Sequence, residues 1–279
     1  RVQKQLQALI ESGDLYEAQQ VFKATNRRLI QRKQYEAAKS LLEKGATLMI
    51  EKKQFTQASE LISLLISVYS QSMELGSVDF LIQLFDQFPS DVKITKILNE
   101  AITWSQEQRT QSVRIKKADP RLLQLQANRY WLNGEYGDSL ESFLEAEAPD
   151  RLVEMLIDWK NKSLDSEGDL VGVKGVLMLL TKGNLKEANE VFDGFVESYE
   201  TRTPILNFTQ FLLLSCERDA YPFFQQLITK YEPSIQRDPQ FKTHLDKIAQ
   251  VFFRVNPSQQ NNFLGDMLKS FLGGAQNTQ

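Results

Sequence analysis

Apolar residues recur along the chain at the three- and four-residue spacing of an amphipathic helix, and the runs end at glycine, proline or short polar groups. The first run has Val2, Leu6, Leu9 and Ile10; the segment SGD at residues 12–14 interrupts it, and a second helix is expected to begin near Leu15. The same pattern predicts helices over residues 58–72, 78–88, 94–108, 120–132, 137–146 and 150–160. No segment alternates apolar and polar residues convincingly, so the pattern predicts an all-α fold.

A short turn motif returns several times. The segment GDLYEA at residues 13–18 is echoed by GEYGDS at 134–139 and GNLKEA at 183–188, and more loosely by KQYEA at 33–37 and KQFTQA at 53–58. Tyr16, Tyr35 and Phe55 in these copies lie 19 and 20 residues apart, a spacing that suits one helix and one short turn. We therefore expect an α-solenoid of stacked antiparallel helix hairpins, tetratricopeptide-like, with these three aromatic side chains largely buried at hairpin corners.

The chain is expected to form a single α-solenoid over residues 1–279, of about seven hairpins by the length of known repeats. Polar stretches at residues 109–119 and 161–172 are the best places for a bend. The first would separate an N-terminal half of about 1–118 from a C-terminal half of about 119–279. Residues 197–204 are too polar for a core, and we expect an exposed excursion there with at most a very small strand element.

Composition and charge narrow the function further. Lys and Arg number 33 against 36 Asp and Glu, which is unlike a general nucleic-acid-binding domain. The one cysteine, Cys216, cannot form an intrachain disulfide and points to a reducing compartment such as the cytosol. No apolar run is long enough to span a bilayer. Neither Cys216 nor the one histidine, His244, belongs to a catalytic or metal-binding motif, so we expect no enzyme activity, no metal and no cofactor.

Two surface patterns suggest protein partners. Lys23, Arg27, Arg28, Arg32 and Lys33 form a basic cluster without an intervening acid. Like charges four residues apart repel, and an acidic partner would relieve that repulsion; a solvated helix face is the plain alternative, and nucleic acid is a weaker one. Residues 263–272 carry an apolar stripe that suits either a final docked helix or a protein groove.

The second unusual feature is the number of phenylalanines, which is 17. A thin two-layer stack cannot easily bury them all, so we expect an apolar surface in the C-terminal half that a partner covers in part. The residues expected there are Phe208, Phe211, Phe223 and Phe224.

Five ordered blocks resemble one family. They are GDLYEAQQ at residues 13–20, YEA at 35–37 with EKGA at 43–46, PILNF at 204–208 with FLLL at 211–214, YEPS at 231–234 with RDP at 237–239, and NFLGDM at 262–267 with FLGG at 271–274. The chain thereby resembles the cytosolic adaptor subunit of the GET pathway, the guided entry of tail-anchored proteins. That resemblance implies an all-helical solenoid without catalysis.

The resemblance also implies partners and residues. The N-terminal half would bind the targeting ATPase of the pathway, with Tyr16, Lys23 and Arg28 on the binding face and Glu60 at a position that restrains ATP hydrolysis; only the charge argument adds Arg27. The C-terminal half would hold a ubiquitin-like-domain protein, and through it a cochaperone carrying tail-anchored substrates for insertion into the ER membrane. A helical-repeat subunit of a proteasome-lid or signalosome type assembly is the alternative hypothesis, although such chains usually end in a winged-helix module that is not visible here.

Overall fold

The computed structural model describes residues 2–72, 76–200 and 202–255, and in these ranges it consists of helices joined by turns and loops, without a strand. The all-α prediction is confirmed. Fifteen helices are described: α1 Val2–Ser12, α2 Leu15–Gln31, α3 Tyr35–Glu51, α4 Phe55–Gln71, α5 Val78–Asp86, α6 Thr95–Val113, α7 Pro120–Leu132, α8 Tyr136–Ala146, α9 Pro149–Lys162, α10 Gly168–Thr181, α11 Leu185–Val196, α12 Pro204–Glu217, α13 Tyr221–Lys230, α14 Glu232–Ile235 and α15 Pro239–Phe253.

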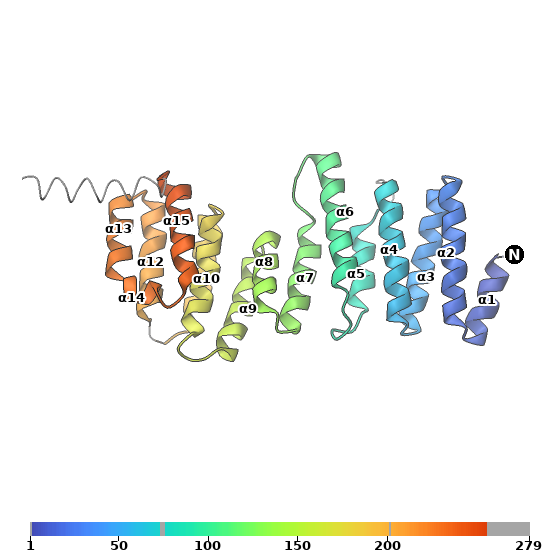
Figure 1. The fold of residues 1–279 in the computed structure, drawn as a ribbon, viewed down its shortest axis with the longest axis horizontal. Helices are drawn as coiled ribbons and strands as arrows, with labels where there is room; N and C mark the ends of the chain where they lie inside the picture. The colour runs from blue at the N-terminus through green and yellow to red at the C-terminus, as the bar shows by residue number, and fades with distance from the viewer. Residues whose placement is uncertain (1, 73–75, 201, 256–279) are drawn as a thin grey trace, which may run out of the picture. The chain divides into compact units, whose positions relative to one another are not determined.

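By its internal packing the chain divides into two compact units, Arg1–Ala146 and Glu147–Gln279. The first unit holds α1 to α8 and the second holds α9 to α15. Within each unit successive helices stand beside one another as antiparallel neighbours (Figure 1), and each buries its apolar face on the helices next to it. The fold is the stack of helix hairpins that the turn motif predicted.

The repeat at the start of the chain has a step of 20 residues. Helices α2, α3 and α4 are each 17 residues long and begin at Leu15, Tyr35 and Phe55. Each follows a residue with positive φ, which is Gly13 at 82°, Lys33 at 57° and Lys53 at 59°. Three residues into each helix is a fully buried alanine, and these are Ala18, Ala38 and Ala58. The small alanine lets the neighbouring helix approach closely. It is the last residue of the motif copies GDLYEA and KQFTQA, whereas in KQYEA the buried alanine is the next residue, Ala38.

This step corrects the expected burial of the aromatic residues. Leu15, not Tyr16, occupies the position equivalent to Tyr35 and Phe55. One residue further along a helix the side chain is rotated by about 100°, and Tyr16 is accordingly 63% exposed. Tyr35 and Phe55 are half-buried rather than enclosed. The prediction that all three are largely buried was therefore wrong for Tyr16 and too strong for the other two.

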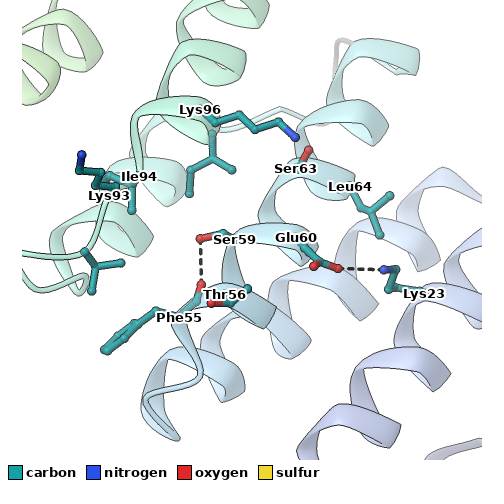
Figure 2. A pocket seen from close by; sticks show the side chains of 12 residues that line it. Lys23, Phe55, Thr56, Ser59, Glu60, Ser63, Leu64, Lys93, Ile94 and Lys96 are labelled. Carbon is teal, nitrogen blue, oxygen red and sulfur yellow. Dashed lines mark hydrogen bonds and ion pairs between the residues drawn. The ribbon is translucent and has the colours of Figure 1, made fainter.

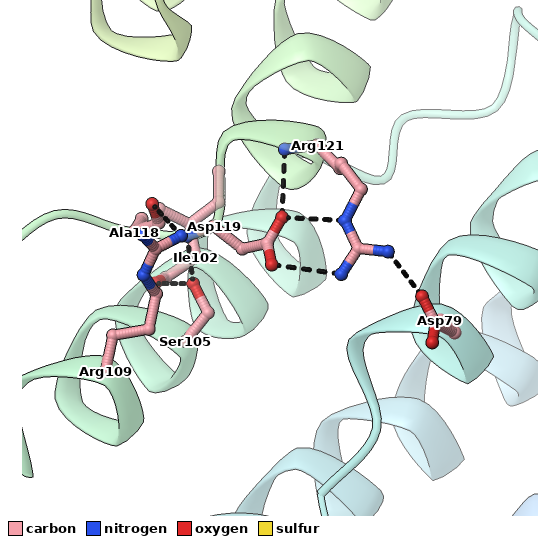
Figure 3. A network of polar contacts seen from close by, with 7 residues as sticks. All are labelled: Asp79, Ile102, Ser105, Arg109, Ala118, Asp119 and Arg121. Atoms are coloured by element: carbon pink, nitrogen blue, oxygen red, sulfur yellow. Dashed lines mark hydrogen bonds and ion pairs between the residues drawn. The ribbon is translucent and has the colours of Figure 1, made fainter. Parts of the chain in front are cut away.

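The expected division near residue 118 also lies elsewhere. Helix α6 continues to Val113, and two side chains of this helix hold the loop that follows (Figure 3). Arg109 donates a hydrogen bond to the carbonyl of Ala118 over 3.3 Å, and the backbone N–H of Asp119 donates to Ser105 Oγ over 3.1 Å. Helix α7 packs against both α5 and α6, so the first compact unit extends through α7 and α8 to Ala146.

Helix α10 forms the centre of the second unit. It is apolar on nearly all sides and contacts α9, α11, α12 and α15. Gly172 lies so close to Phe195 of α11 that a Cβ atom placed there would stand 2.1 Å from the ring. At one end of the helix the buried carboxylate of Asp169 accepts two hydrogen bonds from Arg237, at 2.7 and 3.0 Å.

The polar segment after α11 is held in place by the second unit. The ammonium group of Lys160 donates a hydrogen bond to the carbonyl of Ser198 over 2.6 Å and lies 3.9 Å from the ring centroid of Tyr199. Tyr199 is half-buried, and α12 begins at Pro204. No strand occurs in the described residues of this segment, so the small strand element that the sequence left open is not found there.

Candidate functional site

One line of exposed side chains runs along α2. Because successive residues of a helix are rotated by about 100°, Tyr16, Lys23 and Arg27 lie within about 40° of one another around its axis. Arg28 lies about 140° around the helix from Lys23, so the basic cluster does not form one narrow face. Tyr16, Arg27 and Arg28 are exposed and Lys23 is half-exposed. Tyr16 was expected to be buried, but its side chain is exposed and therefore accessible to a partner.

Lys23 and Glu60, to which the family resemblance assigned separate roles, contact each other. Lys23 Nζ lies 2.8 Å from Glu60 Oε2, and the two side chains are 38% and 50% exposed. The buried amide of Gln19 donates to the same oxygen over 3.0 Å. These two donors, Lys23 foremost, lower the pKa of Glu60 from its ordinary value of 4.5, although burial alone would raise it. The carboxylate is therefore ionised and held at neutral pH.

Beside this ion pair lies an open groove of about 440 Å³ between α4 and the start of α6 (Figure 2). Lysines stand on two sides of it: Lys23 is near Glu60, and Lys93 and Lys96 are on the other side. The rest of the lining combines short polar side chains with apolar ones, and comprises Phe55, Thr56, Ser59, Ser63, Leu64, Val92, Ile94 and Ile97. A groove of this lining can bind a side chain or a short segment of another protein.

In the second unit the four expected phenylalanines separate into two pairs. Phe208 and Phe224 are buried in the core, with 0% and 1% exposure. Phe211 and Phe223 are 38% and 40% exposed, and their rings meet edge to face with centroids 6.3 Å apart. The expectation of one apolar surface containing all four is corrected, because two of the side chains point into the helix stack. The apolar stripe at residues 263–272 lies outside the described residues.

Cys216 and His244, the two residues that the sequence analysis considered for catalysis or metal binding, lie among residues of the helix packing. Cys216 is buried, and this burial raises the pKa of its thiol to about 12. Burial lowers the pKa of His244, and the positive charge of nearby Lys174 lowers it further. Among the described residues no three His, Cys, Asp or Glu side chains are grouped to hold a metal ion. In those same ranges no helix combines the length and apolarity needed to cross a membrane.

Sequence reasoning did not find three further residues of this site, which are Gln19 of α2, Lys93 before α6 and Lys96 in α6. The signal for Gln19 is a polar residue on the apolar side of α2, between buried Ala18 and Phe22. Lys93 and Lys96 lie some 70 residues from Lys23, and no local pattern connects them. The 20-residue step offers one signal for the ion pair. Helices two steps apart, such as α2 and α4, lie side by side, so residues about 40 positions apart meet, as Lys23 and Glu60 do.

These features define the class of the protein as an all-α helical-repeat protein of stacked hairpins. The family model described as Golgi to ER traffic protein 4 matches residues 32–272, and the chain belongs to this family. The homologue from Dictyostelium discoideum is 34% identical over 98% of this chain and 89% of its own length. The human homologue is 28% identical over 99% of this chain and 88% of its own length. The resemblance drawn from the five sequence blocks is confirmed.

The fold comparison agrees with the family. The crystal structure titled "C. therm. Get4" superposes with a TM-score of 0.81, covering 100% of this chain and 98% of that one at 24% sequence identity. This likeness confirms the α-solenoid prediction. The family match also replaces the alternative of a proteasome-lid or signalosome subunit.

Proposed function

We propose that the chain acts in the GET pathway, the Golgi to ER traffic system of its family's description, as an adaptor without catalytic activity in the cytosol. It binds the targeting ATPase through its first unit and a ubiquitin-like-domain protein through its second. By holding both, it brings a cochaperone loaded with a tail-anchored protein close to the ATPase, and this raises the effective concentration for handover before insertion into the ER membrane. The observation that carries the proposal is the family match over residues 32–272.

The geometry of α2 supports the first contact. Tyr16 presents an exposed aromatic ring in line with Lys23 and Arg27, and aromatic and basic side chains are frequent anchors of protein interfaces. Arg28 extends the positive surface around the helix. Such exposed charges act mainly on the association rate and are screened by salt. Glu60, at the edge of this surface, is the residue proposed to restrain ATP hydrolysis in the complex.

Phe211 and Phe223 support the second contact. Both rings are more than a third exposed, and they meet edge to face across α12 and α13. An exposed aromatic pair of this kind suits the apolar surface of a folded domain better than a charged polymer. Phe208 and Phe224 act indirectly in this proposal, because they hold α12 and α13 in position from inside the core.

The test measures binding of the purified targeting ATPase as a function of salt. Lys23 is paired with Glu60, so the cleaner perturbation is Tyr16→Ala combined with Arg27→Glu. We expect this variant to bind at least about tenfold more weakly at physiological salt, with a reduced salt dependence. The matched control is Lys44→Glu alone, which reverses one exposed charge elsewhere in the first unit, as Arg27→Glu does on α2.

Two results would count against the proposal. Equal binding by the wild type and the α2 variant would show that this face is only a solvated helix surface. Unchanged binding of the ubiquitin-like partner after Phe211→Ser and Phe223→Ser would exclude the aromatic pair as its contact. Circular dichroism checks that each variant retains its helical content.

A further inference from the structure

The groove between α4 and the start of α6 has features that the exposed face of α2, formed by Tyr16, Lys23 and Arg27 and called the α2 face below, does not explain. Its apolar lining includes half-buried Phe55, Leu64 and Val92, and the buried side chains of Ile94 and Ile97 lie below. Short polar residues leave the space between these apolar groups open. A leucine-sized side chain of another protein could therefore lose its water shell here without displacing any part of the chain.

The segment before α6 that carries Lys93 is anchored by contacts with α7 and α4. Arg129 of α7 donates hydrogen bonds to the carbonyls of Phe85, Phe88 and Pro89 at 2.8, 2.7 and 2.8 Å. The ring of Phe88 in turn lies 5.6 Å from that of Phe55, which lines the groove. The segment leading into α6 is thus fixed to two neighbouring helices. A preformed site loses less conformational entropy on binding than a mobile loop would.

The charges around the groove favour a carboxylate. Lys93 is exposed and, within the described part of the chain, has no carboxylate partner, while Lys96 is 88% exposed and reaches Glu100 only at 4.0 Å. Glu60 shows the effect of these charges on an acidic group. Lys23 and Gln19 hold its carboxylate directly, and the positive charge of Lys96 also lowers the pKa of Glu60 from a distance.

We infer that this groove binds a short acidic segment of the targeting ATPase, with carboxylates at Lys93 and at Lys96 and an apolar side chain against Phe55 and Leu64. The inference rests on the proposed function for the identity of the partner, and adds to the α2 face a second contact with residues of its own. The mixed lining argues for a protein segment, because a nucleic acid would need stacked aromatic platforms.

The first experiment tests the groove without the ATPase. A labelled protein is titrated with a short peptide that carries glutamates on both sides of two leucines, and with the same peptide carrying lysines in place of glutamates. Backbone amide shifts report where each peptide binds. We expect the acidic peptide to shift the amides of Ser63, Lys93 and Lys96, and the basic peptide to leave them unchanged.

Charge reversal then tests the assignment of the lysines. Lys93→Glu combined with Lys96→Glu should raise the Kd of the acidic peptide about tenfold or more, and the control Lys44→Glu with Lys116→Glu should change it less than about twofold. The absence of shifts at millimolar peptide would overturn the inference. So would equal shifts from both peptides, equal effects of the two variants, or displacement of the acidic peptide by a single-stranded oligonucleotide.

The second experiment uses the ATPase itself and separates the two proposals. The groove variant should weaken ATPase binding several-fold when the α2 face is intact. If only the groove variant weakens binding, the α2 contact is wrong and the groove contact stands. If only the Tyr16→Ala and Arg27→Glu variant does so, the groove inference is wrong and the proposed function stands.

Discussion

We expect the side chain of Arg129 to stabilise the first unit more than that of Arg121 does. Replacing Arg129 with methionine tests this expectation. Methionine keeps most of the length and volume of the side chain, so the change removes hydrogen bonds without opening a large cavity. The guanidinium group satisfies the carbonyls of Phe85, Phe88 and Pro89 at and beyond the end of α5. The carbonyl of Phe85 also accepts a hydrogen bond from the Phe88 N–H over 3.2 Å, and that of Pro89 accepts one from the Val92 N–H over 3.1 Å. Arg129 adds a charged donor at this helix end, where the regular helical bonds stop.

The magnitude follows from the exposure of the three acceptors. A hydrogen bond from a charged donor contributes about 1.5–3 kcal/mol. Pro89 is exposed, and its carbonyl can bond to water in the variant, whereas the bonds to Phe85 and Phe88 are partly buried. Two bonds at the lower value give about 3 kcal/mol. Partial burial of the guanidinium, which lowers the pKa of Arg129, costs desolvation energy. This cost offsets part of the stabilisation by the hydrogen bonds, so we use the lower value for each bond. We therefore expect a loss of about 3 kcal/mol in the free energy of unfolding.

The assay is urea denaturation followed by tryptophan fluorescence. Because the chain divides into two units, the measurement is made in a Trp159→Phe background, where Trp104 and Trp131 both report the first unit. Hydrogen exchange at the amides of Val92 and Ile94 should accelerate in the variant, since the segment leading into α6 loses its support.

Arg121→Met is the matched control. Arg121 pairs with Asp119 and Asp79 (Figure 3), but its side chain is 53% exposed, and exposed ion pairs contribute only about 0–1 kcal/mol. Losses of the same size for Arg129→Met and Arg121→Met would refute the reasoning, because the backbone carbonyls would then gain nothing from the half-buried Arg129 donor. A loss below about 1 kcal/mol for Arg129→Met would do the same.

Three further predictions concern stability. Glu60→Gln should cost less than about 1 kcal/mol at pH 7, because the ion pair is half-exposed. Since the pKa of Glu60 is lowered on folding, this contribution is present above pH 4.5 and should vanish as the pH falls through the folded pKa, in paired urea titrations of both proteins. Gly172→Ala should cost about 1–3 kcal/mol by overpacking, and Phe195→Leu should restore part of that loss in the melting temperature. Phe208→Ala should cost about 3–5 kcal/mol, whereas Phe211→Ala should cost clearly less; equal losses in thermal melts would contradict the observed burial.

Local sequence patterns determined the elements of this protein. Helix periodicity, the turn motif and the placement of prolines predicted an all-α stack, because each depends on residues within one or two helical turns. The starts of α7 at Pro120 and of α12 at Pro204 follow from proline at the first helical position. The five ordered blocks likewise sufficed for the family. The turn motif also predicted the register of the repeat to within one residue. That shift of one residue assigned the corner position to Tyr16 instead of Leu15, and the burial predicted for Tyr16 was therefore wrong.

Contacts between distant helices were decided only by the tertiary structure. Lys23 and Glu60 are 37 residues apart, and they meet because α2 and α4 lie side by side in the stack. Phe208 and Phe211 belong to one helix and have the same chemistry, yet one is enclosed and the other exposed, because neighbouring helices cover only part of the surface of α12. Periodicity shows that a helix has an apolar face. Which residues at the edge of that face are covered depends on where the other helices pack, and this is a property of the whole unit.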